Sequence, residues 1–76
     1  MKNILIYTTK TCPYCVMAKK LLEQRGLAYT EIRVDLDEAQ REIMIERSQR
    51  RTVPQIFIDE QSIGGYDDLS AYFSTR

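Results

Sequence analysis

The sequence predicts an α/β domain in which a four-stranded mixed sheet lies between helices, with its elements in the order β-α-β-α-β-β-α. Three patterns support this fold class. A nearly continuous apolar run at residues 4–7 is typical of a strand buried on both faces. A stripe with helical spacing follows it, and an alternating strand comes next. These three segments form a βαβ unit, whose right-handed crossover makes the first two strands parallel.

The first predicted helix runs from about Pro13 to Arg25. Pro13 suits the first helical position, where no N–H is needed, and Gly26 supplies the left-handed conformation that ends many helices. One stripe of this helix faces the core and consists of Cys15, Ala18 and Leu22, with Leu21 beside it.

The following segments predict a second strand and a second helix. Apolar or β-branched residues alternate with charged ones at residues 30–34, as expected near a sheet edge. Asp37 and Gln40 resemble a capping box, which predicts a helix that continues to about Arg47. Its apolar positions at helical spacing are Leu36, Ala39, Ile43 and Met44.

The last third of the chain predicts a hairpin and a closing helix. Strands are expected at residues 55–59 and 61–63, joined by a tight turn at Asp59-Glu60. The chain then bends at Gly64-Gly65. A final helix begins at Asp67 or Asp68, and its core-facing residues are Leu69, Tyr72 and Phe73.

Length and charge exclude several classes of protein. Seventy-six residues are enough for one small domain, which we expect to span residues 1–76. Eleven basic residues balance 11 acidic ones, so no overall field attracts nucleic acid, and no basic amphipathic helix indicates a membrane surface. The apolar run at residues 4–7 is too short for a signal-peptide core or a membrane span. We therefore expect a protein of the reducing cytosol.

Both cysteines lie in the segment Cys12-Pro13-Tyr14-Cys15, between the first strand and the first helix. A sulfur at a helix N-terminus faces unsatisfied N–H groups and the positive end of the helix dipole, which favour the thiolate. Cys15 lies one turn further along the helix, close enough to form a disulfide with Cys12. Because Cys12 is at the exposed tip and Cys15 begins the buried stripe, we expect Cys12 to be the nucleophile and Cys15 the resolving thiol.

Other interpretations of this pair are less favoured. A closed zinc site takes four ligands, whereas this chain has two cysteines and no histidine, so we expect no metal. A structural disulfide between residues so close in sequence would restrict the unfolded chain very little. A chance pair of cysteines stays open, although the strand-to-helix context and the reducing compartment favour redox chemistry.

Three separated motifs resemble the glutaredoxin family, in the order that glutaredoxins have them. The motifs are Thr11-Cys12-Pro13-Tyr14-Cys15, Thr52-Val53-Pro54-Gln55 and Gly64-Gly65-Tyr66-Asp67-Asp68. The resemblance implies the thioredoxin-like fold, a cis Val53-Pro54 bond and glutathione as reductant and co-substrate. It also implies that glutathione is contacted by Lys10, Tyr14, Thr52, Val53, Pro54, Gly65, Tyr66, Asp67 and Asp68.

Two of these motifs have a physical interpretation of their own. Pro54 marks the entry of a strand, and the exposed backbone of Val53 could pair with a peptide such as glutathione. Gly64-Gly65 allows close backbone approach, and the helix after it offers N–H groups to a carboxylate. Asp67 and Asp68 suit an ammonium, Asp68 more than Asp67 because the family often has Ser or Thr at the other position. Without a ligand, the same residues would be a plain strand entry and plain helix caps.

One position departs from the family pattern. Many glutaredoxins have a lysine three residues before the nucleophile, where it meets the glycine carboxylate of glutathione. This chain has Thr9 there and Lys10 next. Lys10 could still reach the ligand through its long side chain, or the cation could be one of Arg47, Arg50 and Arg51.

The resemblance implies a glutathione-dependent oxidoreductase that reduces protein disulfides and protein–glutathione mixed disulfides through Cys12 and Cys15. We expect a monomer whose protein partners carry disulfides or glutathione, with ribonucleotide reductase among the candidates. Three alternatives remain: an electron donor to that enzyme reduced by thioredoxin reductase, an iron–sulfur carrier formed by two copies and two glutathiones, and a redox-inert binding module.

Overall fold

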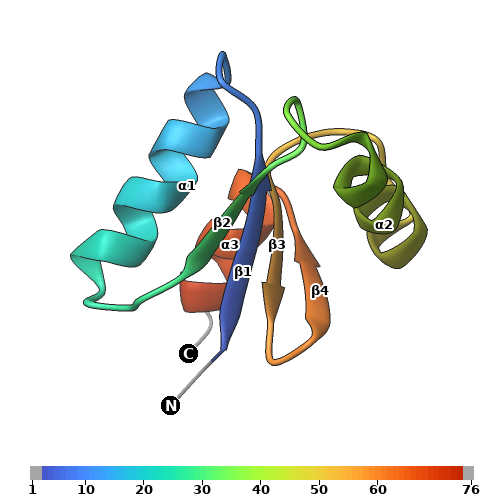
Figure 1. Cartoon of the computed structure of the whole chain (residues 1–76). Helices are drawn as coiled ribbons and strands as arrows, with labels where there is room; N and C mark the ends of the chain where they lie inside the picture. The colour runs from blue at the N-terminus through green and yellow to red at the C-terminus, as the bar shows by residue number, and fades with distance from the viewer. Residues whose placement is uncertain (1–2, 75–76) are drawn as a thin grey trace.

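The computed structural model describes residues 3–74, and the predicted domain range 1–76 includes four terminal residues outside them. The element order β-α-β-α-β-β-α is confirmed (Figure 1). The elements are β1 (Ile4–Thr8), α1 (Pro13–Gln24), β2 (Thr30–Arg33), α2 (Glu38–Ser48), β3 (Gln55–Ile58), β4 (Gln61–Gly64) and α3 (Tyr66–Ser74). The sheet order is β2-β1-β3-β4; β1 and β2 are parallel, and the other two pairs are antiparallel.

The sheet separates two apolar cores, which makes the domain three-layered. On one face, α1 and α3 pack against β1 and β3, and the buried residues there are Ile4, Ile6, Ala18, Leu22, Ile56, Ile58, Leu69 and Phe73. On the other face, α2 contributes Met44 to a smaller cluster with Tyr7, Val34 and Phe57. Because side chains alternate along a strand, β1 and β3 supply both clusters, as the apolar run of β1 predicts.

The helix boundaries follow the predicted caps closely. Gly26 has a φ of 69° just beyond α1, and the Asp37 carboxylate accepts a hydrogen bond from the Gln40 N–H at 3.2 Å. Ser48 extends α2 by one residue beyond the predicted end. The helix then ends at Gln49, which is left-handed with a φ of 61°.

The apolar residues whose spacing predicts α2 do not form a buried face. Of these four residues, only Met44 is buried, whereas Leu36 is 76% exposed and Ile43 is 40% exposed. Leu36 lies in the turn before the helix, and α2 faces this core with Met44 and with the partly buried Ile45 beside it.

The hairpin and the closing helix differ from their predicted bounds by one or two residues. Asp59 and Glu60 both have positive φ, which matches the tight turn expected between β3 and β4. The last helix starts at Tyr66 because the Asp68 carboxylate reaches back to the Gly65 N–H, at 3.0 Å, and so caps the first turn. Within residues 3–74, no helix has the length and apolar character needed to cross a membrane.

Candidate active site

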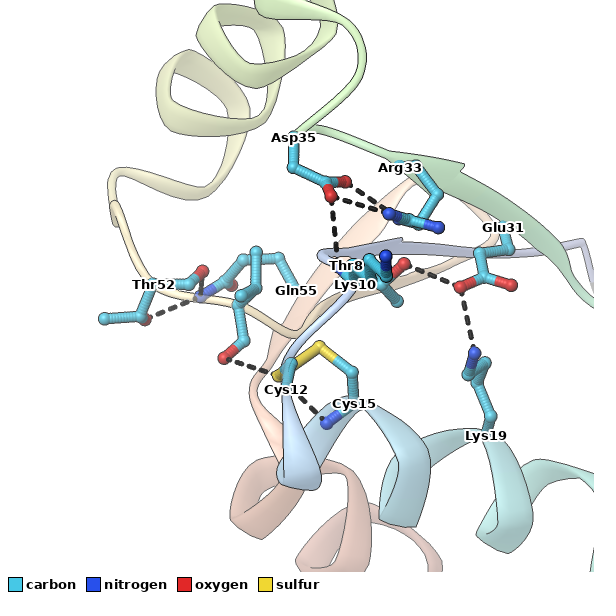
Figure 2. Close-up of a disulfide and its surroundings, with 11 residues drawn as sticks. Thr8, Lys10, Cys12, Cys15, Lys19, Glu31, Arg33, Asp35, Thr52 and Gln55 are labelled. Carbon is cyan, nitrogen blue, oxygen red and sulfur yellow. Dashed lines mark hydrogen bonds and ion pairs between the residues drawn. A yellow bond between two sulfur atoms is a disulfide. The ribbon is translucent and has the colours of Figure 1, made fainter.

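The antiparallel pairing of the two central strands, β1 and β3, brings two loops together at one end of these strands. Tyr7, near the end of β1, pairs with Gln55 at the start of β3. The loop that leaves β1 therefore lies beside the loop that enters β3. Figure 2 shows the result: the Cys12 sulfur faces the backbone that precedes Gln55. Its Sγ atom is 3.8 Å from the carbonyl oxygen of Val53.

The two cysteines form a disulfide in which they have different environments. Cys12 is the N-cap of α1 and is partly exposed, whereas Cys15 is 1% exposed and belongs to the core. The Cys15 N–H donates to the Cys12 sulfur at 3.1 Å. After reduction the same N–H can stabilise a thiolate on Cys12, together with the helix dipole. The geometry therefore favours Cys12 as the attacking sulfur and Cys15 as the resolving one.

The peptide bond between Val53 and Pro54 is cis, as the resemblance implies. Pro54 is buried, while Val53 is partly exposed and faces the cysteine loop. This segment therefore forms one wall of the site, directly beside the sulfur atoms.

A cavity of about 290 Å³ begins at this wall and ends at the first turn of α3. It is lined by Tyr14, Arg50, Thr52, Val53, Pro54, Gly65, Tyr66, Asp67 and Asp68. The structure thus brings together every predicted ligand contact except Lys10, and it adds Arg50. We call this cavity, with these lining residues, the groove.

Arg50 and Asp68 form the charged end of the groove. The Asp68 Oδ2 atom accepts hydrogen bonds from the Gly65 N–H and from the Arg50 guanidinium, each at 3.0 Å. These two donors, the Gly65 N–H more than Arg50, lower the pKa of Asp68 below its ordinary value. The Oδ1 atom makes no hydrogen bond within residues 3–74, so it can accept one from a ligand.

The two glycines beside Asp68 have different roles. Gly64 has a φ of 117°, and a β-carbon there would collide with the Asp68 carboxylate. Gly65 has an ordinary φ, and a β-carbon would make only a normal contact, at 3.6 Å, with the Pro54 carbonyl oxygen. The close approach that the sequence predicts for both glycines is therefore needed at Gly64 alone.

Two tyrosines flank the groove. The rings of Tyr14 and Tyr66 have centroids 6.1 Å apart and an interplanar angle of 30°. Tyr14 is 58% exposed although it is large and apolar, so its ring is available to a substrate. Tyr14 lies in the first turn of α1 and Tyr66 in the first turn of α3, so the two helices each contribute one ring to the lining of the groove.

Lys10 lies outside the residues that line the groove. Its N–H donates to the Asp35 carboxylate at 3.2 Å, and that carboxylate is held by the Arg33 guanidinium (Figure 2). The hydrogen bonds from Arg33 are the main reason that the pKa of Asp35 falls to about 2. Asp35 thus anchors the loop before Cys12 from the end of β2. The predicted contact between Lys10 and glutathione stays a prediction.

A polar cluster that was not predicted from the sequence links Thr8, Glu31 and Lys19. The buried Thr8 hydroxyl donates to the Glu31 carboxylate at 2.6 Å, and the Lys19 ammonium pairs with that carboxylate at 3.0 Å. The hydrogen bond from Thr8 is the largest cause of the lowered pKa of Glu31. This cluster ties β1, β2 and α1 together. Its only sequence signal was a polar residue at the end of an apolar run.

The fold and the site together define a thiol–disulfide oxidoreductase of the thioredoxin-like class: a dithiol at a helix N-terminus faces a cis-proline loop. The sequence matches the family model described as Glutaredoxin over residues 4–63, and the chain belongs to the glutaredoxin family. It is a glutathione-dependent thiol–disulfide oxidoreductase.

Known proteins support this placement. The chain is 58% identical over 71 residues to Glutaredoxin 3 of Escherichia coli strain K12, which covers 93% of this chain and 86% of that protein. The structure superposes on a buckwheat glutaredoxin–glutathione complex with a TM-score of 0.88 and 28% identity, over 97% of this chain and 70% of that one. Glutaredoxin 1 from Francisella tularensis, complexed with cacodylate, gives a TM-score of 0.84 and 35% identity, over 99% and 95% of the two chains.

The lowered pKa of Asp68 predicts a pH-dependent contribution to stability. A carboxylate with a depressed folded-state pKa stabilises the fold above its ordinary pKa of 3.8, and this contribution is lost as the pH falls through the lowered value. The difference in unfolding free energy between the wild type and Asp68→Asn should therefore be largest at neutral pH and shrink below pH 3.8. Urea unfolding at a series of pH values measures it.

Asp67→Asn is the matched control, because Asp67 lies in the same turn and its carboxylate makes no hydrogen bond or ion pair within residues 3–74. Its effect on stability should change less with pH. An equal pH dependence for both variants would contradict the assignment to Asp68.

Proposed function

We propose that glutathione binds in the groove and that Cys12 exchanges disulfides with it, both on glutathionylated proteins and on protein disulfides. One observation carries the proposal: the groove begins at Val53, whose carbonyl oxygen is 3.8 Å from the Cys12 sulfur, and ends at the charged pair of Arg50 and Asp68. A peptide in the groove would therefore have its thiol at the nucleophile and its charged end at the far side.

The chemistry of the groove fits the parts of glutathione. The cysteinyl part can lie along Val53 and pair with its backbone as an added strand does. The γ-glutamyl end carries an ammonium and a carboxylate. Asp68 suits the ammonium through its Oδ1 atom, while the N-terminus of α3 and Arg50 suit the carboxylate.

Of the three arginines considered from the sequence, only Arg50 lines the groove. The Arg47 guanidinium lies 4.4 Å from the centroid of the Phe57 ring, and Arg51 lines a separate hollow beside α2. Arg50 is therefore the one of these three arginines placed to meet a carboxylate in the groove, at the γ-glutamyl end and not at the glycine end that the family lysine serves.

With a glutathionylated protein, the proposed cycle needs Cys12 alone. The Cys12 thiolate attacks the glutathione sulfur, a Cys12–glutathione disulfide forms, and the protein thiolate leaves and takes up a proton. A second glutathione, as thiolate, attacks the bound glutathione sulfur. This step releases glutathione disulfide and restores the Cys12 thiolate.

With a protein disulfide, the proposed cycle uses both cysteines. Cys12 attacks one protein sulfur and displaces the other as a thiolate. Cys15 then attacks the Cys12 sulfur, which releases the second protein thiolate and leaves the Cys12–Cys15 disulfide that the structure contains. Two glutathione molecules reduce this disulfide and become glutathione disulfide.

We also propose that the protein works as a monomer in the cytosol. The completion of the groove by residues of a single chain supports the monomer. A dithiol that must return to the reduced state suits a reducing compartment. Ribonucleotide reductase stays a predicted protein partner, and the lack of a resident metal stays a prediction as well.

Replacing each cysteine tests the two sulfur roles. Cys15→Ser should keep the reduction of a small glutathione mixed disulfide and lose the dithiol reduction of protein disulfides, because only the second reaction needs a resolving thiol. Cys12→Ser should lose both. Glutathione oxidation, coupled to glutathione reductase, measures the rates. Activity retained in Cys12→Ser would contradict the assignment, and a wild type reduced only by thioredoxin reductase would contradict glutathione as the reductant.

Replacing each candidate cation tests the charged end of the groove. Arg50→Gln should raise the KM for glutathione about fivefold, because an exposed charge-assisted hydrogen bond to a carboxylate is lost. Lys10→Gln is the matched substitution outside the groove and should change the KM less. The difference should shrink at high salt. A larger effect for Lys10→Gln would show that its side chain reaches the ligand and that Arg50 serves only Asp68.

A further inference from the structure

We propose that Gln55 is a positioning residue that aims the Val53 N–H into the groove and so sets how tightly glutathione binds. The inference rests on the proposed function, because it concerns the backbone on which glutathione would lie. Gln55 itself is buried and does not line the groove. It contacts Thr52, which does line the groove, from the protein interior.

The side chain of Gln55 holds Thr52 with two hydrogen bonds. Gln55 is 1% exposed, and its Nε2 atom donates to the Thr52 carbonyl oxygen at 3.0 Å and to the Thr52 hydroxyl at 3.2 Å (Figure 2). Thr52 is exposed and lines the groove. The first residue of β3 therefore fixes a groove residue from behind, across the cis-proline segment.

Holding the Thr52 carbonyl also orients the next N–H. The Thr52 carbonyl and the Val53 N–H belong to one planar peptide unit, and this unit is trans, because the cis bond in this segment is the following one. In a trans unit the C=O and the N–H point in opposite directions. A carbonyl drawn inward by Gln55 thus turns the Val53 N–H outward, toward a ligand that needs a backbone donor.

Packing alone does not explain why a buried amide, which lowers the stability of the fold through one unpaired oxygen, occupies position 55. Its Oε1 atom is buried and has no hydrogen-bond partner within residues 3–74. A buried acceptor without a partner lowers stability, whereas a methionine of similar length would fill the site without that penalty. The benefit of the amide therefore lies in the orientation of Thr52 and Val53.

Gln55→Met tests this inference, because it keeps the length of the side chain and removes both hydrogen bonds. The KM for glutathione should rise roughly 5- to 10-fold, as expected when two hydrogen bonds that order a binding segment are lost. The kcat should change little. The midpoint of thermal unfolding should stay the same or rise, since the unpaired acceptor disappears as well.

Dithiothreitol provides a readout that separates positioning from a general effect on the cysteines. It reduces the Cys12–Cys15 disulfide without offering a peptide backbone to Val53. Its rate constant should therefore be equal in the wild type and Gln55→Met. Met44→Leu, a conservative change in the core on the face of the sheet that Gln55 shares, should leave both the KM and the dithiothreitol rate unchanged.

The outcomes are distinct. A lowered unfolding midpoint with an unchanged KM would show that Gln55 is only structural and would overturn the inference. If Gln55→Met does not fold, Gln55→Leu repeats the comparison, and unfolding of both variants would overturn it too. A wild type that glutathione reduces no faster than a non-peptide thiol of equal acidity would instead overturn the proposed groove.

Discussion

The antiparallel register of β1 with β3 is the constraint on which the site depends. It places the end of β1 opposite the start of β3. The loop that carries Cys12 and the loop that carries Val53 and Pro54 therefore meet at this end of the two strands. The apolar side chains of the two strands enter both cores and hold this register, because a slip of one residue would turn every side chain to the opposite face. The position of Cys12 beside Val53 thus depends on the packing of the sheet.

The residues that react and the residues proposed to bind the ligand come from different segments around this end of the strands. At the N-terminus of α1 the two cysteines have different environments, because Cys12 is partly exposed and Cys15 is buried. The loop before β3 supplies backbone beside the sulfur, and Gln55 holds that loop from inside. The first turn of α3 supplies charge at the other end, where Gly64 leaves room for the Asp68 carboxylate. Each part comes from a different segment, and the sheet sets their spacing.

Much of this arrangement could be predicted from local patterns. The caps at Asp37 and Gly26, the alternation in the strands and the cysteine spacing act within one or two helical turns, so the sequence displays them directly. The grouping of the groove residues came from resemblance. What sequence could not show were contacts between distant segments: Arg50 with Asp68, Glu31 with Thr8, and the turn of the Gln55 amide back to Thr52. The exposure of Leu36 could not be predicted for a related reason, since helical spacing does not reveal which apolar side chains the core covers.

The central claim is that one groove connects the Cys12 sulfur to the charged pair at α3. A crystal structure of the Cys15→Ser protein, trapped as its mixed disulfide with glutathione, tests this claim most directly. We expect the glutathione sulfur on Cys12, its cysteinyl backbone paired with Val53, and its γ-glutamyl ammonium beside Asp68. A glutathionyl group that leaves Val53 unpaired and lies over the outer face of α1 would contradict the account.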